Sequence, residues 1–231
     1  SLKVESRIVT SKINSVSIRA GLGEGLRYIR QNDLLPGLIF FSFLVEFSAF
    51  PIVNGLMTVI SDELYDLGGT GIGLLAATAS IGALTGALTL GGKQHIASPG
   101  RTMVVGSIVW HTVMLLLALT PPLWLFALLL FMWGFCGGMT FVAMVVGLLR
   151  EAPAETRGRV MGIRSLGIYG LPIGLLLGGF IAEEAGSAAM IGALGGIGLL
   201  ATLGAALKWP ALLRGASRSA SSTVTTEDRA N

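Results

Sequence analysis

The segment Arg150–Gly179, REAPAETRGRVMGIRSLGIYGLPIGLLLGG, decides the fold class of this chain. Its first half is basic, and its second half is an apolar run with glycine at every fourth position: Gly170, Gly174 and Gly178. A basic stretch beside an apolar segment indicates which side of a membrane it occupies. Glycine at this spacing leaves one face of a helix bare, so that another helix can approach closely. The segment therefore predicts a transmembrane helix with a defined orientation and a close-packing face.

The composition also indicates a membrane protein. The 231-residue chain is 52% hydrophobic and only 13% charged, whereas soluble domains carry about 25% charged residues. Its 33 glycines are better tolerated in membrane helices than in soluble ones, where each costs roughly 1 kcal/mol. One cysteine excludes an intramolecular disulfide, and with two histidines it argues against a structural metal site. The basic residues are spread through loops between apolar runs, which favours a membrane surface over nucleic acid.

Six apolar segments are each long enough to cross a hydrocarbon core about 30 Å thick. Residues 1–33 are expected to form a cytoplasmic linker with a basic amphipathic helix on the membrane surface, although an ordinary solvated linker is an equal alternative. Residues 210–231 are expected to form a disordered cytoplasmic tail, preceded by Lys208 and Trp209 as an interfacial anchor. The transmembrane domain covers 34–209, with spans at about 34–60, 71–92, 102–120, 122–149, 160–182 and 187–209.

The charges alternate from one connection to the next. All 16 basic residues lie in the two flanks, in the loop after the second span or in the loop after the fourth. The other connections contain no Lys or Arg, and two of them are acidic: Asp62, Glu63 and Asp66 in one, Glu183 and Glu184 in the other. Because cytoplasmic loops carry the excess of Lys and Arg, the pattern predicts an all-α integral membrane protein with six crossings and both termini in the cytoplasm.

Glu46 is the most informative polar residue. It lies about ten residues into the first span, hence roughly 15 Å deep, where a carboxylate costs at least about 2.5 kcal/mol. Asn54 follows a little over two helical turns later, near the same face, and Pro51 between them predicts a kink. We expect Glu46 and Asn54 to face a polar pathway for a proton or a cationic substrate. The alternative is a neutral acid that hydrogen bonds to a neighbouring helix.

His111 lies at a similar depth in the third span. Its neighbours are apolar apart from Thr112, which favours a neutral imidazole that bonds between helices over a site residue. In the fourth span, glycines and aromatic residues could form the wall of a cavity, although ordinary core or lipid contacts are the favoured alternative. These residues are Gly134, Gly137 and Gly138, with Phe131, Trp133 and Phe135.

Glycines at four-residue spacing recur in several spans. This spacing predicts close helix packing, either within the chain or against the second half of a transporter. The candidate packing and interface residues are Gly82 and Gly86 in the second span, Gly170, Gly174 and Gly178 in the fifth, and Gly192 and Gly196 in the sixth.

The sequence contains none of the motifs that mark metalloproteases, serine hydrolases or P-loop ATPases. We therefore expect no enzymatic activity, no catalytic residues and no cofactor, and ATP-driven transport is disfavoured. Arg157, Arg159 and Arg164 are expected in a cytoplasmic loop, where they set the orientation of the chain. They are also candidates for salt bridges or helix-end contacts that break as a transporter changes state.

Several stretches resemble the C-terminal half of a bacterial major facilitator superfamily transporter, of the efflux type that includes siderophore and macrolide exporters. GLRYIR at 25–30 resembles the end of the central loop, and GIGLL at 71–75 resembles the eighth helix. PAETRGRVMG at 153–162 is similar to the loop between the tenth and eleventh helices, and 172–179 to the eleventh. The resemblance covers about 21–209. It departs from the family at 91–101, where the usual G-x-x-x-D-R-x-G-R loop has lost its Asp.

This resemblance implies one six-helix half of the major facilitator fold, in which two halves rock around a site at the membrane midplane. The first and fourth helices of each half line the cavity, which would place Glu46 and Asn54 in it. The second and fifth helices face the other half, and the third and sixth are peripheral, which weakens His111 as a site residue.

We therefore expect half of a secondary transporter in a bacterial inner membrane, one that exports an amphipathic small molecule in exchange for protons. Its expected partners are the lipid bilayer, the substrate, protons and an N-terminal six-helix half. The alternatives are a half-transporter that works as a homodimer, a non-transporting membrane scaffold and a membrane-embedded enzyme. Glu46 argues against the scaffold, which has no need of a carboxylate at the midplane.

Overall fold

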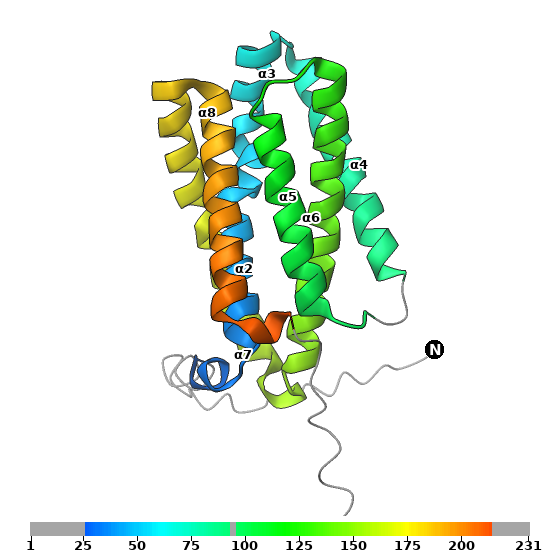
Figure 1. The fold of residues 1–231 in the computed structure, drawn as a ribbon, viewed down its shortest axis with the longest axis vertical. Coiled ribbons are helices and arrows are strands. Elements are labelled where there is room, and N and C mark those ends of the chain that lie inside the picture. Colours follow the sequence, from blue (N-terminus) through cyan, green and yellow to red (C-terminus); the bar gives the residue numbers. More distant parts are fainter. Residues whose placement is uncertain (1–25, 93–95, 214–231) are drawn as a thin grey trace, which may run out of the picture.

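The computed structural model describes residues 26–92 and 96–213, which form a bundle of long helices (Figure 1). The described residues contain no strand, and the prediction of an all-α membrane fold is confirmed. Most of the predicted linker, including the start of its amphipathic helix, and most of the predicted tail lie outside the described residues. Residues 26–31, at the end of that linker, are helical.

The described residues form ten helical elements from Leu35 onward. Five helical segments within the described residues are long and apolar enough to cross a membrane. In chain order the elements are α2 (Leu35–Ser48), η1 (Ile52–Leu56), α3 (Met57–Tyr65), α4 (Gly69–Gly91), α5 (Pro99–Leu117), α6 (Leu123–Glu151), α7 (Ala154–Ser165), η2 (Leu166–Tyr169), α8 (Gly170–Lys208) and η3 (Pro210–Leu212).

The first span is a composite of α2, η1 and α3. The Oδ1 of Asn32 accepts hydrogen bonds from the backbone N–H groups of Leu34 (2.8 Å) and Leu35 (3.0 Å), which satisfies donors at the start of α2. Pro51 has no N–H to donate to the carbonyl of Phe47, and directly after it the chain widens into η1, a π-helical turn. Such turns are frequent at functional sites, so η1 is a structural irregularity in the middle of a span.

The last of these five helical segments folds into two legs. The segment Arg157–Lys208 has 52 residues, far more than the roughly 20 that a hydrocarbon core requires. It is interrupted at Gly186, where φ is +86° and the backbone is not helical. In Figure 1 the two legs of α8 lie side by side and are joined at the upper end of the bundle. This geometry gives six crossings, and it places the turn where the sequence has its acidic pair Glu183 and Glu184.

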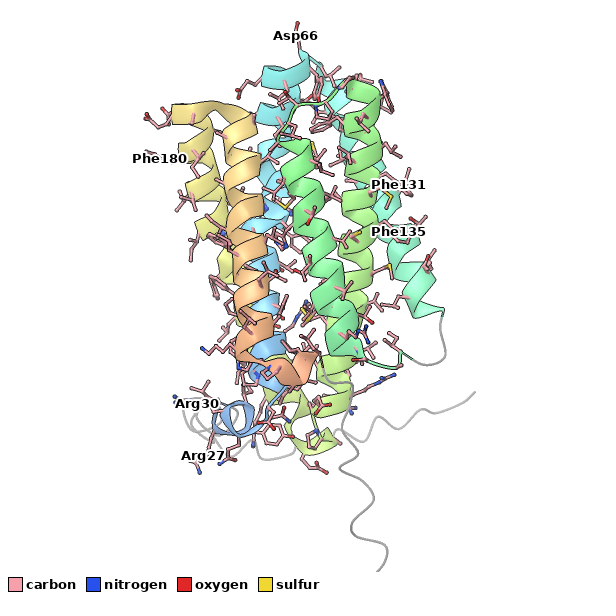
Figure 2. All side chains as sticks on the ribbon, in the orientation of Figure 1. Arg27, Arg30, Asp66, Phe131, Phe135 and Phe180 are labelled. Carbon is pink, nitrogen blue, oxygen red and sulfur yellow. The ribbon has the colours of Figure 1, made fainter. Side chains whose placement is uncertain are left out.

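The charged residues collect at the two ends of the bundle. Figure 2 shows Asp66 at one end, and Arg27 and Arg30 at the other. Between these ends the buried core consists of two apolar clusters, one around Trp110 and Phe126 and one around Phe41 and Met103. The long apolar middle with charge at both ends is the distribution expected of a bundle that spans a bilayer.

Candidate functional site

Glu46 lies on α2, one turn before Pro51. Its side chain is half-buried, and a Cβ added at Gly170 of α8 would lie 3.3 Å from the Glu46 Cβ. The carboxylate therefore stands close to the start of α8. Asn54 lies in η1, is exposed, and donates a hydrogen bond from Nδ2 to the carbonyl of Phe50 (3.0 Å). No hydrogen bond joins Glu46 to Asn54 in the part of the chain that the structure describes.

Arg164 is the residue that the structure brings to Glu46. The sequence placed it in a loop, but it lies on α7, and its half-buried side chain extends into the bundle. Its guanidinium carbon is 5.1 Å from the centroid of the Phe141 ring on α6, a cation–π distance. Its positive charge acts on Glu46 only at longer range, since no ion pair or hydrogen bond joins the two side chains among the described residues. Glu46, Arg164 and Phe141 thus form one group contributed by three helices.

One atom of this group is left without a partner. The Nε of Arg164 is buried and makes no hydrogen bond among the described residues. A buried donor without an acceptor costs about 1–3 kcal/mol, so such atoms are rare unless they serve a role.

Arg157 and Arg159 also lie on α7 and not in a loop, and both are exposed. The guanidinium of Arg157 donates a hydrogen bond to the carbonyl of Leu149 in the last turn of α6 (3.1 Å). A cation at the C-terminal end of a helix satisfies carbonyls that lack partners and complements the helix dipole. Arg157 therefore makes a contact of the helix-end kind that the sequence suggested.

A cavity opens beside the Glu46–Arg164–Phe141 group. It has a volume of about 310 Å³, at the lower end of the range for small-molecule sites. Its wall is almost entirely apolar and includes four aromatic side chains: Phe50, which lies between α2 and η1, Trp110 of α5, and Trp133 and Phe141 of α6. Phe141 lines the cavity and also stacks under Arg164. Neither Glu46 nor Arg164 lines the cavity, so Phe141 is the residue that connects it to these charges.

Only some of the residues that the sequence suggested for a cavity wall in the fourth span line the observed cavity. Gly134, Gly137, Gly138 and Trp133 line the cavity, as the sequence suggested. Phe131 and Phe135 are absent from the lining and stack on each other, with ring centroids 6.5 Å apart. Figure 2 shows both near the α4 side of the bundle. Phe131 and Phe135 are therefore not part of this cavity.

Comparison with known proteins decides the family. The family model for the Major Facilitator Superfamily matches residues 37–227. The chain belongs to the Major Facilitator Superfamily. It is similar to the multidrug efflux pump Tap of Mycolicibacterium fortuitum, with 30% identity over 171 residues, which is 74% of this chain and 41% of that protein. The chain thus spans about two fifths of the length of this relative. The predicted resemblance to an efflux-type member of this superfamily is confirmed.

The glycines of this Major Facilitator Superfamily chain lie at close contacts between its own helices. A Cβ added at Gly82 or Gly86 of α4 would lie 2.2 Å or 2.0 Å from the carbonyl oxygens of Phe131 and Phe135 on α6. Reciprocally, Gly134 of α6 faces the carbonyl of Ala79, at 2.0 Å from its added Cβ. Small residues on both helices thus allow the two backbones to touch.

The glycines of α8 make the same kind of contact with the first span. An added Cβ at Gly170 would lie 2.7 Å from the carbonyl oxygen of Phe43, and one at Gly174 would lie 2.0 Å from that of Phe47. Gly178 faces the side chain of Leu56. Five of the seven glycines that the sequence singled out in α4 and α8 are buried against helices of the same chain: Gly82, Gly86, Gly170, Gly174 and Gly178. The other two do not make such contacts, since an added Cβ would lie 3.5 Å from the Cβ of Ala118 at Gly192 and would have nothing within 4 Å at Gly196. Contact with a second half would therefore involve other faces of these two helices.

His111 is completely buried and joins three helices. Its Nε2 is 2.8 Å from the Oγ of Ser48 on α2, and its Nδ1 is 2.8 Å from the carbonyl of Ser107 on α5. The Oγ of Ser107 is in turn 3.0 Å from the Oγ1 of Thr202 on α8. Gly198 makes room for the ring, because an added Cβ would lie 2.0 Å from its Cδ2. This arrangement is the interhelical bonding that the sequence favoured.

Sequence reasoning missed Arg164 and Phe141 as neighbours of Glu46. They are 118 and 95 positions away in the chain, and no local pattern links them. One signal was available for Arg164. Of the basic residues in the connection between the fourth and fifth apolar segments, Arg164 is the one nearest the fifth segment. Its long side chain can therefore reach into the bundle while its backbone stays near the surface.

Proposed function

We propose that this chain is the C-terminal half of a secondary transporter that exports amphipathic small molecules in exchange for protons. The observation that carries the proposal is the half-buried carboxylate of Glu46, which interacts with Arg164 beside an aromatic cavity. An ionisable residue within a membrane span marks a proton or substrate pathway by default. Family membership and the similarity to a multidrug efflux pump support the same activity.

The site suits a substrate with an apolar body and a charged group. The aromatic rings of the cavity offer contact area to the apolar body. Glu46 is the natural partner for a cationic group or for a proton, since both compete with Arg164 for the same carboxylate. Binding of either would neutralise the carboxylate and remove its long-range attraction for the Arg164 guanidinium, and binding and movement would be coupled through this change in charge.

Two exposed apolar faces support a partner half. Leu74, Ile81, Leu84 and Leu88 on α4 are all more than half exposed, and Leu176 and Phe180 on the first leg of α8 are 76% and 63% exposed. The family arrangement places these two helices against the N-terminal half. A second copy of the chain would cover the same faces in a homodimer, and the mass of the purified chain in detergent distinguishes the two arrangements.

The charge alternation supports a location in a bacterial inner membrane with both termini in the cytoplasm. In this orientation α7, which carries Arg164, lies at the cytoplasmic end of the bundle (Figure 1). Asp66 and Glu63 lie at the outer end.

Transport in proteoliposomes tests the proposal. The full-length protein that contains this chain is expected to move a fluorescent cationic dye against its gradient when a pH gradient is imposed. Glu46→Gln is expected to lower this pH-driven rate at least about tenfold, because an amide does not take up a proton at the pH of the assay. Asp66→Asn is the matched control, since it removes an exposed carboxylate at the end of the bundle. Normal pH-driven transport by Glu46→Gln would contradict the proposal.

A further inference from the structure

A second pocket lies at the end of the bundle opposite Asp66. It forms where the helix at 26–31 and the start of α2 meet the end of α8, and it has a volume of about 300 Å³. Arg30 lines it from the helix, Asp33 from the bend between the helix and α2, and Lys208 and Trp209 from the end of α8. Figure 2 shows Arg30 at this end. The aromatic cavity has none of these residues in its wall, so the two pockets are separate.

Two positive charges meet in this pocket. Arg30 and Lys208 come from opposite ends of the described chain, and neither forms an ion pair with a carboxylate among the described residues. The ammonium of Lys208 instead lies 4.8 Å from the centroid of the Trp209 ring. Both cations are therefore available to an anion in the pocket, and the guanidinium of Arg30 matches the geometry of a phosphate.

The pocket lies at the level where the spans end. α2 begins at Leu35 and α8 ends at Lys208. Trp209 packs against Phe40 of α2, with ring centroids 5.5 Å apart. Tryptophan is enriched at the boundary between hydrocarbon and headgroups. The pocket is thus open to the headgroup layer of the membrane.

An apolar stripe leads from the pocket toward the membrane interior. Leu200, Leu203 and Leu207 are 72%, 42% and 84% exposed, and their spacing puts them on one face of the second leg of α8. The stripe ends next to Lys208. A ligand with a phosphate and long acyl chains would use both features, whereas a free phosphate would use only the first.

We propose that this pocket binds the phosphodiester of a membrane phospholipid, with Arg30 and Lys208 paired to the phosphate and the acyl chains along Leu200, Leu203 and Leu207. Asp33 lines the same pocket, and its carboxylate accepts a hydrogen bond from the ammonium of phosphatidylethanolamine or a hydroxyl of phosphatidylglycerol. The choline headgroup has no such donor. The lipid ties the start of the first span to the end of the last one.

Native mass spectrometry tests this proposal on the full-length protein in detergent with added phosphatidylethanolamine, phosphatidylglycerol or phosphatidylcholine. The double variant Arg30→Gln, Lys208→Gln is expected to bind the first two lipids at least about tenfold more weakly, since each basic residue contributes roughly a factor of five at a membrane surface. The charge-preserving variant Arg30→Lys, Lys208→Arg is expected to keep binding, which separates lost charge from misfolding. Phosphatidylcholine is expected to bind the unsubstituted protein more weakly than the other two.

Arg27→Gln is the matched control. Arg27 lies on the same short helix, is exposed and does not line the pocket. Equal loss of lipid in Arg27→Gln, or unchanged binding in the double glutamine variant, overturns the proposal. Displacement of the lipid by millimolar inorganic phosphate would show a small-anion site and would overturn the lipid assignment. Equal binding of phosphatidylcholine would overturn the role of Asp33.

Discussion

At the scale of single residues, a missing side chain is as important as a charged one. Gly174 lies against the carbonyl of Phe47 and the ring of Pro51, at 2.0 Å and 2.7 Å from an added Cβ. Pro51 has no N–H for that carbonyl, and the bare Cα of glycine lets the α8 backbone approach it. The sequence showed both the glycines at four-residue spacing in α8 and the proline in the first span, but nothing in the sequence indicated that Gly174 and Pro51 are in contact.

Gly174→Ala is expected to destabilise the protein, because its methyl group would overlap a backbone oxygen that has no room to move. Overpacking of this kind costs about 1–3 kcal/mol, and we expect a fall of several degrees in the apparent Tm of the detergent-solubilised protein. Gly179→Ala is the control on the same helix, since nothing lies within 4 Å of an added Cβ there. Equal Tm values for the two variants would show that the contact is not tight.

At the scale of elements, the turn at Gly186 determines how many times the chain crosses the membrane. The carboxylate of Glu63 on α3 accepts hydrogen bonds from the backbone N–H of Ser187 (3.0 Å) and from its Oγ (2.6 Å). Ser187 is at the N-terminal end of the second leg of α8, where N–H groups lack helical partners and a negative charge is favourable. Glu63 therefore caps this leg from another helix.

Glu63→Ala is expected to loosen the turn of α8 and to lower the apparent Tm, since the loss of a helix cap costs about 0.5–2 kcal/mol. The same variant is expected to speed amide hydrogen exchange in the residues that follow Gly186. Glu184→Ala serves as the control, because Glu184 is exposed in the same turn region. If Glu184→Ala lowered the Tm as much, removal of any acidic residue there would be the cause.

At the scale of the whole molecule, the chain is a bundle with two chemically different ends. The basic residues of α7 and of the helix at 26–31 lie at one end, and Asp66 lies at the other (Figure 2). The positive-inside rule assigns the basic end to the cytoplasm. The proposed orientation of the chain follows from this difference between the two ends, and the proposed lipid pocket lies at the basic end.

Cysteine labelling tests the orientation. The chain has a single, buried cysteine, Cys136, so a cysteine introduced at an exposed position reports on that position alone. Asp66→Cys is expected to react with a membrane-impermeant maleimide in intact cells. Glu155→Cys at the start of α7 is expected to react only after permeabilisation. The reverse pattern would contradict the proposed topology.

The sequence by itself determined the all-α fold class, and it predicted six crossings and the bounds of the spans. These properties follow from local hydropathy and from the cost of burying charge in hydrocarbon, which each segment carries independently of the others. The six predicted spans correspond to the observed elements, including the two legs of α8. The glycine spacing also identified residues at close contacts, because helical periodicity is a local property.

Only the tertiary structure decided which residues meet. It showed that Gly82, Gly86, Gly170, Gly174 and Gly178 contact helices of their own chain, and that Arg164 belongs with Glu46 and Phe141. It also showed that the irregularity predicted at Pro51 takes the form of a π-helical turn directly after the proline. Contacts between helices depend on the rotation and depth of each helix, and these are set by packing against several partners at once. No single segment of the sequence contains that information.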